Sequence, residues 1–113
     1  MTIEAFIIKH LNEELGGINA HGLVPADKPD TFVVLERTGG SIENFLHHSM
    51  FVTDCYAKTL EQACILSEQV IAAMQRLPLK GRVTNVSVNS AYNDTDTETH
   101  EYRYGVLFDI THR

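Results

Sequence analysis

The stretch that decides the fold is residues 32–78, FVVLERTGGSIENFLHHSMFVTDCYAKTLEQACILSEQVIAAMQRLP. It opens with a predicted strand, Thr31–Arg37, whose nearly continuous apolar run is typical of a strand covered on both faces. Gly39-Gly40 predicts a hairpin turn. A second strand is predicted over Leu46–Ala57, which is rich in β-branched and aromatic residues. A capped helix follows, so this stretch predicts a strand hairpin and a helix, with no catalytic motif.

Two helices are predicted from their caps and their apolar spacing. The second begins at the capping box Thr59–Gln62 and ends at Pro78. Its predicted core face is Leu60, Ala63, Cys64, Val70, Ile71, Met74 and Leu77. The first helix is predicted over Ile3–Leu15, with Thr2 as N-cap and Gly16-Gly17 at its end. Both patterns indicate helices that bury one face.

Two further strands are predicted near the C-terminus. Val83–Tyr92 alternates between apolar and polar residues, and we expect Val86 and Val88 to point inward. Tyr102–Ile110 has an aromatic or apolar residue at every second position, which also fits a strand. A polar link, Asn93–Glu101, joins the two.

The coarse element order predicts an α+β fold. Residues 18–25 are predicted equally well as a connecting loop or as an edge strand. Because consecutive strands are joined by short links, the sequence favours a mostly antiparallel sheet of four to five strands with two helices packed on one face. At 113 residues, the chain has the length of a single domain, 1–113.

Composition narrows the function classes. The formal net charge is −6, and the nine Lys and Arg are scattered, whereas a nucleic-acid groove needs clustered basic residues. No apolar segment approaches the ~20 residues that span a bilayer. Cys55 and Cys64 fall in a predicted strand and a predicted helix, which favours buried thiols in a reducing cytoplasm over a disulfide.

Three parts of the chain carry a family resemblance. They are the ERTGG segment at residues 36–40, the strand that ends in Tyr56-Ala57, and the Tyr92-Asn93 pair before the last strand. In these parts, and along residues 31–113 as a whole, the chain resembles the tail terminator (tail completion) proteins of long-tailed bacteriophages.

The resemblance implies a structural virion assembly protein that is not an enzyme and has no cofactor. It implies a hexameric ring that caps the completed tail tube at its head-proximal end, after assembly in the host cytoplasm. The implied partners are further copies of the chain, the tail tube protein and the head–neck connector protein, with no membrane. DNA passes through the lumen of such a ring without specific binding. We expect an acidic lumen wall, because negative charge repels phosphate.

The candidate interface residues are charged or polar and lie at predicted strand ends and links: Glu36, Arg37, His47, His48, Asp94, Asp96 and Glu98. The adjacent charges of Glu36 and Arg37 fit either ordinary solvation at a sheet rim or a salt bridge between ring neighbours. The candidate docking segments are Leu23–Asp30, Ser41–His48 and Asn93–His100.

Metal binding is disfavoured in both places that suggest it. Side chains of adjacent strand residues point to opposite faces, so His47 and His48 do not chelate one ion together. Asp94, Asp96 and Glu98 copy the first three ligand positions of a calcium loop. However, the later positions that need glycine and glutamate hold Thr99 and Gly105.

Two other functions remain open at this point. One is a ferredoxin-like regulatory module that binds a small ligand, and the other is a neighbouring phage neck or head-completion protein. A ring of six copies without a ligand distinguishes the terminator from the regulatory module, for which we expect a two-fold dimer with a pocket.

Overall fold

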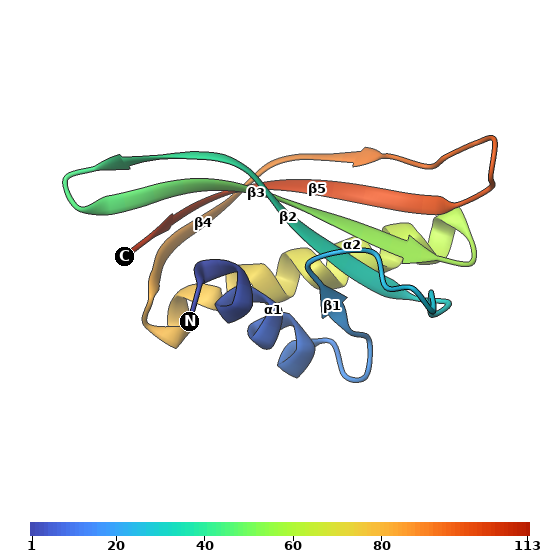
Figure 1. Ribbon diagram of the computed structural model, residues 1–113, viewed down its shortest axis with the longest axis horizontal. Helices are drawn as coiled ribbons and strands as arrows, with labels where there is room; N and C mark the ends of the chain where they lie inside the picture. The colour runs from blue at the N-terminus through green and yellow to red at the C-terminus, as the bar shows by residue number, and fades with distance from the viewer.

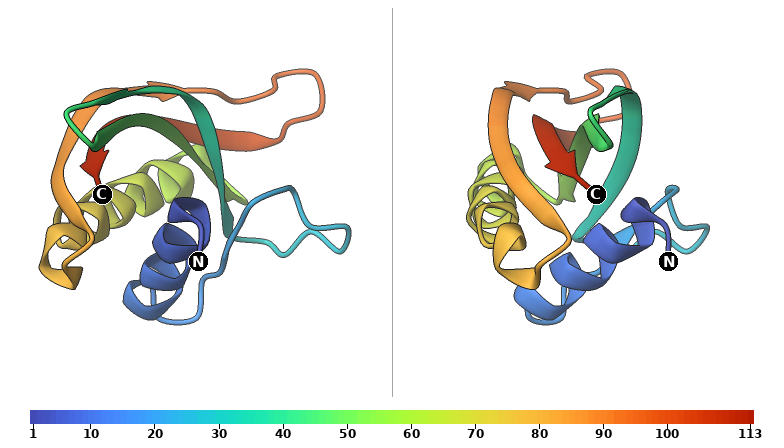
Figure 2. Two further views of the ribbon diagram at one scale, coloured as in Figure 1. Left: turned by 60° about the vertical axis from the view of Figure 1, so that its left-hand side comes forward. Right: turned by 90° about the vertical axis from the view of Figure 1, so that its left-hand side faces the viewer.

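A computed structural model describes all 113 residues, and it shows two helices on one side of a five-stranded sheet (Figures 1 and 2). The elements in chain order are α1 (Ile3–Glu14), β1 (Ala20–His21), β2 (Phe32–Glu43), β3 (Leu46–Ala57), α2 (Leu60–Gln75), the 3-10 helix η1 (Leu77–Lys80), β4 (Val83–Asn93) and β5 (Tyr102–His112). The predicted α+β class, with both helices on one face, is confirmed.

The sheet has the strand order β1-β2-β3-β5-β4. All neighbours pair antiparallel except the short β1, which runs parallel to β2 and pairs only with Val33 and Val34. The stretch 18–25 therefore holds a two-residue edge strand within a loop. β3 and β4 both run antiparallel to β5, so β3, α2 and β4 form a β-α-β unit with β5 inserted between its strands. The free edges of the sheet are β4 and the outer half of β2.

Both helices begin at the N-caps that the sequence predicts. The Thr2 hydroxyl accepts a hydrogen bond of 3.1 Å from the Ala5 amide, and the Thr59 hydroxyl accepts one of 3.1 Å from the Gln62 amide. Each cap satisfies a backbone donor that the first helical turn leaves free. α2 passes into η1, which holds Pro78 near its start.

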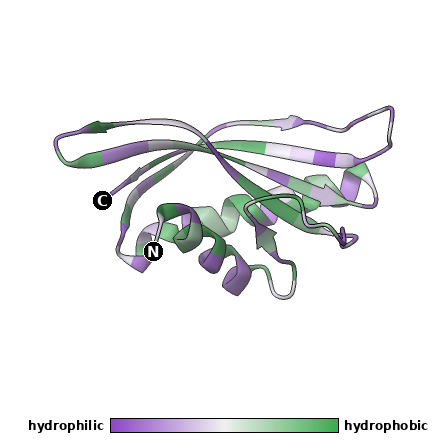
Figure 3. Ribbon diagram, in the orientation of Figure 1, coloured by the Kyte–Doolittle hydropathy of each residue, from purple (hydrophilic) through white to green (hydrophobic).

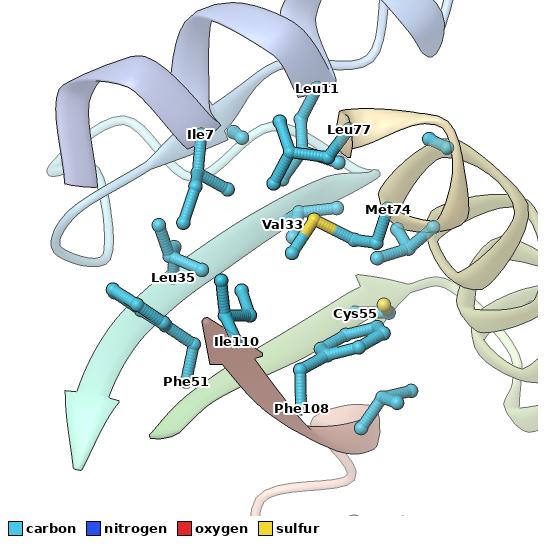
Figure 4. Close-up of a cluster of buried hydrophobic side chains, with 14 of the residues drawn as sticks. Ile7, Leu11, Val33, Leu35, Phe51, Cys55, Met74, Leu77, Phe108 and Ile110 are labelled. Carbon is cyan, nitrogen blue, oxygen red and sulfur yellow. The ribbon is translucent and has the colours of Figure 1, made fainter. Parts of the chain in front are cut away.

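The core fills the space between the inner face of the sheet and both helices (Figure 4). Its largest fully buried side chains come from every layer and include Phe51, Phe108, Ile7, Leu11, Met74 and Leu77. The predicted face of α2 is correct at Val70 and Met74, both fully buried. It is wrong at Leu60, which is 39% exposed because it lies at the first position of the helix. Leu66, which the prediction omitted, is buried instead.

The turn between β2 and β3 lies at Asn44-Phe45, so the turn predicted at Gly39-Gly40 is wrong. Asn44 and Phe45 have left-handed φ values of 51° and 65°, as a two-residue type I′ hairpin requires. The glycines belong to β2, where Thr38 has no partner in β3 and forms a bulge. The second glycine is needed for a close approach, because a Cβ there would lie 2.7 Å from the carbonyl oxygen of His48.

The displaced turn makes the hairpin longer than predicted. β2 continues six residues past Arg37, so most of the predicted docking segment Ser41–His48 is strand rather than link. In Figure 1 the β2–β3 tip and the β4–β5 connection lie at opposite ends of the long axis, in a molecule of 44 × 24 × 24 Å.

Val88 lies on the inner face of the sheet, as predicted, but it is not buried. Val88 pairs with the buried Phe108 but is 39% exposed itself. β4 is an edge strand, and its contacts with the core end at Val86. The alternation along β4 therefore determines the face on which each side chain lies. Whether the side chain is buried depends on whether the core extends to that position.

Candidate interface

The face of the sheet that points away from the helices carries no helix or further sheet, and we call it the open face (Figure 2). At one end of this face Phe32 and Tyr56 are buried, and Lys28 forms an ion pair with Glu101 nearby. Because side chains alternate along each strand, the register fixes which residues lie on this face. The charged strand residues on the open face are Glu36, Glu43, Asp54, Asp109 and Arg103. Four carboxylates against one guanidinium make this face acidic.

Asp54 is the most perturbed carboxyl group on the open face. It lies within β3, paired with Val34 on one side and Gly105 on the other. Its carboxyl group is half-buried, and its Oδ1 atom has no hydrogen-bond partner. Burial, and then the neighbouring Asp94 carboxylate, raise the pKa of Asp54 from 3.8 to about 6. Carboxyl groups whose pKa is strongly raised by burial and a neighbouring like charge are common at functional sites.

Tyr92 lies across β5 beside this carboxyl group. It pairs with Gly105, and a Cβ at that glycine would be 2.8 Å from the tyrosine ring. Gly105 therefore lets the ring rest directly on the backbone of β5. Burial, followed by the charges of Asp54 and Asp94, raises the pKa of the Tyr92 hydroxyl. The ring thus adds an aromatic surface to an otherwise acidic site.

Arg103 joins the open face to the base of the β4–β5 connection. Its Nε atom donates a hydrogen bond of 2.9 Å to the carbonyl oxygen of Asp94, and its guanidinium lies 3.5 Å from the Glu101 carboxylate. The same guanidinium lies 5.9 Å from the centre of the Tyr56 ring, which stacks on Phe32 at 4.3 Å. These contacts hold the base of the connection in one position relative to the sheet.

The predicted interface residues Glu36 and Arg37 point to opposite faces of β2. Glu36 is exposed on the open face, whereas the Arg37 guanidinium donates a hydrogen bond of 2.9 Å to the buried Ser49 hydroxyl. Ser49 Oγ in turn lies 2.8 Å from His112 Nε2, and the His47 ring stacks on His112 at 5.0 Å. Arg37 is thus engaged within its own chain, and the salt bridge between neighbouring copies stays a prediction.

The structure also separates the two adjacent histidines. His47 packs on His112 on the helix side of the sheet, whereas His48 is exposed and shares a hydrogen bond of 3.3 Å with the Thr111 hydroxyl. The prediction that their side chains point to opposite faces is confirmed. Burial is the main cause that lowers the pKa of His112 below its ordinary value of 6.5.

The three acidic residues of the β4–β5 connection have different roles. Asp94 belongs to the group around Asp54. Asp96 folds the connection, because its Oδ1 accepts hydrogen bonds from the amides of Glu98 and Thr99 at 3.0 and 3.4 Å. The Glu98 amide is the main cause that lowers the pKa of Asp96. Glu98 is exposed, and no three His, Cys, Asp or Glu side chains gather as metal ligands would.

The group around Asp54 was missed by the sequence prediction. The sequence signal for this group was the single aspartate within the largely apolar strand FVTDCYA. Charged residues are rarely buried unless they are paired, so a charge in such a strand marks a candidate site. The sequence did not show its neighbours, since Asp94 and Tyr92 reach Asp54 only through the pairing of β3 with β5 and of β5 with β4.

Compared with known proteins, the chain matches no family model and no curated sequence. No helix of the chain combines the length and the hydrophobicity needed to cross a membrane. The sequence resemblance and the geometry of the open face are therefore the basis for the function proposed below.

Proposed function

We propose that the chain is a structural virion assembly protein, a tail terminator. Identical copies form a ring that caps the completed tail tube and presents a surface that joins the tail to the head. The observation that carries this proposal is the open face, a side of the sheet without a helix over it that carries four carboxylates and one guanidinium.

The charge of the open face supports its use as the wall of a DNA channel. A wall rich in carboxylates repels phosphate, and this repulsion reaches about 8 Å at physiological ionic strength. DNA then passes close to the wall without a lasting contact. The central part of the open face is backed by the core.

The shape of the molecule supports contacts with several partners at once. The β2–β3 hairpin and the β4–β5 connection lie at opposite ends of a 44 Å long axis. In a ring, these two ends can reach different partners: a neighbouring copy of the chain, the tail tube protein or the head–neck connector protein. The free edges of β2 and β4 lie along the sides, where further copies of the chain are placed. The proposed role is contact alone, without catalysis or a cofactor.

Native mass spectrometry of the purified chain over a concentration series tests the ring. We expect a species of six copies without a bound small molecule. A stable dimer that carries a small-molecule adduct would contradict the proposal and support the ferredoxin-like regulatory module.

A deletion of residues 94–99 tests the role in the virion. None of these residues is buried, so we expect the shortened chain to fold, as judged by circular dichroism. We expect it to fail in completing tails, with a loss of complete phage particles. An unchanged particle yield would count against the assignment of this connection as a docking surface.

A charge reversal on the open face tests the channel wall. Glu36→Lys combined with Asp109→Lys makes the open face basic, and we expect the assembled ring to bind DNA at low salt. The matched control, Glu61→Lys combined with Glu68→Lys, makes the same change in net charge on exposed positions of α2. Equal DNA binding by both variants would show that the open face does not line the channel.

A further inference from the structure

The tip of the β2–β3 hairpin carries a phenylalanine at a position where this turn favours glycine. Phe45 has a left-handed φ of 65° and is 96% exposed. Large residues are rarely found with positive φ, because the side chain crowds the backbone. Ile42, which precedes the turn, is also exposed, at 68%. Hydrophobic segments stand at this end of the hairpin in Figure 3, although nothing within the chain covers them.

The same chain contains a cavity that can receive an aromatic side chain. It has a volume of about 380 Å³ and lies between α1 and η1. Phe6 and Met1 are its hydrophobic lining residues, and Lys9, His10, Glu13 and Lys80 complete it. The cavity therefore joins an apolar lining to two ammonium groups.

One lining residue of this cavity is a buried group without a full set of partners. His10 is only 3% exposed, and its Nε2 atom donates a hydrogen bond of 2.6 Å to the carbonyl oxygen of Ala73. The neutral ring then has a lone pair on Nδ1, and this atom has no partner in the chain. A buried acceptor without a donor is unfavourable, and because this atom has almost no accessible surface, the cost belongs to the folded chain itself.

The charges at the tip and at the cavity are complementary. Glu43 is exposed at the tip and forms no ion pair within the chain. Lys9 is exposed at the cavity and is likewise unpaired, while Lys80 lies 3.2 Å from Glu13.

We propose that the hairpin tip, residues 42–45, inserts into the α1–η1 cavity of a second copy of the chain. Phe45 packs against Phe6, and Glu43 lies beside Lys9. The tip and the cavity are different surfaces, so the contact is heterologous and repeats from copy to copy until a ring closes. The contact itself is argued from the tip and the cavity. Only the number of copies in the closed ring rests on the proposed function.

Two substitutions at Phe45 test the contact by sedimentation velocity over a concentration series. We expect Phe45→Ala to weaken association at least about tenfold, as for a buried aromatic anchor. The matched control is Leu23→Ala, which removes a side chain that is 82% exposed and lies outside the tip, and we expect it to leave association unchanged. Phe45→Gly is expected to weaken association but to raise the melting temperature of the chain at a dilution where it is monomeric, because glycine relieves the strain of the turn. A purely structural role for Phe45 would not move these two quantities in opposite directions.

A charge exchange identifies the two sides of the contact. We expect Glu43→Lys and Lys9→Glu each to weaken association, and the double variant to recover most of the loss. Glu61→Lys combined with Lys9→Glu is the control, and no recovery is expected there.

The outcomes separate this contact from the proposed function. Six copies that persist in Phe45→Ala would overturn the contact and leave the ring in place. A wild-type chain that is monomeric at every concentration would overturn the contact as well. If Phe45→Ala then failed to bind tail tubes, the tube would be the occupant of the tip rather than a second copy.

Discussion

Replacement of Asp54 by asparagine is expected to stabilise the chain at neutral pH. The carboxyl group is half-buried, lacks a partner for Oδ1 and lies beside the Asp94 carboxylate. Asparagine has the same shape without the charge. The substitution therefore removes the unfavourable ionisation of a half-buried acid and keeps the packing of β3.

The expected gain in the free energy of unfolding follows from the raised pKa of Asp54. The difference between the ordinary pKa of 3.8 and the pKa of about 6 in the folded chain corresponds to about 3 kcal/mol without solvent screening. Because the group is partly open to solvent, screening reduces this figure, and we expect about 1–2 kcal/mol at pH 7. For a chain of this size that gain raises the melting temperature by about 4–8 °C.

The sign of the pH dependence is fixed by the same pKa. The folded chain keeps the Asp54 proton up to about pH 6, whereas the unfolded chain releases it near pH 3.8. The stability that Asp54 contributes is thus present below pH 3.8 and is lost as the pH rises through 6. The advantage of Asp54→Asn should accordingly vanish in acid.

Urea denaturation of both proteins at pH 7 and pH 4 measures these differences. Glu98→Gln, at an exposed position of the β4–β5 connection, is the matched control and should change stability by less than about 0.5 kcal/mol. Asp54→Asn no more stable than wild type at pH 7, or an equal gain at both pH values, would refute the reasoning.

Three further predictions concern the core, a helix cap and acid stability. Met74→Ala, at a fully buried position, should lower the free energy of unfolding by about 2–5 kcal/mol in urea denaturation, and no loss would place this face outside the core. Thr59→Ala should cost about 1 kcal/mol, because the Gln62 amide loses its acceptor, while Thr97→Ala at an exposed position should cost almost nothing in the same assay. His112 has a lowered pKa, so its contribution to stability is complete above pH 6.5 and declines as the pH falls below that value. Melting temperatures between pH 7.5 and 5 should therefore decline less steeply for His112→Gln than for wild type, and parallel declines would contradict this expectation.

The sequence alone determined the elements whose signals are local. Thr2 and Thr59 begin the two helices as predicted, because a cap depends on residues within one turn. The strand predicted over Leu46–Ala57 has those bounds in the structure, and its strand-favouring residues Phe51, Val52, Thr53 and Tyr56 lie from its middle onward.

The hairpin turn was predicted at the wrong place because two residue pairs compete for it. Gly39-Gly40 is the stronger turn signal, yet the chain turns at Asn44-Phe45. Placing the turn there keeps Leu35 and Phe51 on the core side, and a bulge at Thr38 absorbs the extra residue. Burial of the hydrophobic face across two strands thus outweighed the local preference for glycine.

Only the tertiary structure decided the surroundings of Asp54 and His10. Tyr92 and Asp94 lie about 40 residues after Asp54 and reach it through strand pairing, while His10 meets Ala73 where α1 packs beside α2. The residue types were visible in the sequence, but a pKa or an unpaired acceptor depends on neighbours that only the folded chain supplies. The sequence therefore determined which segments form helices and strands, and the long-range packing determined which side chains form a site.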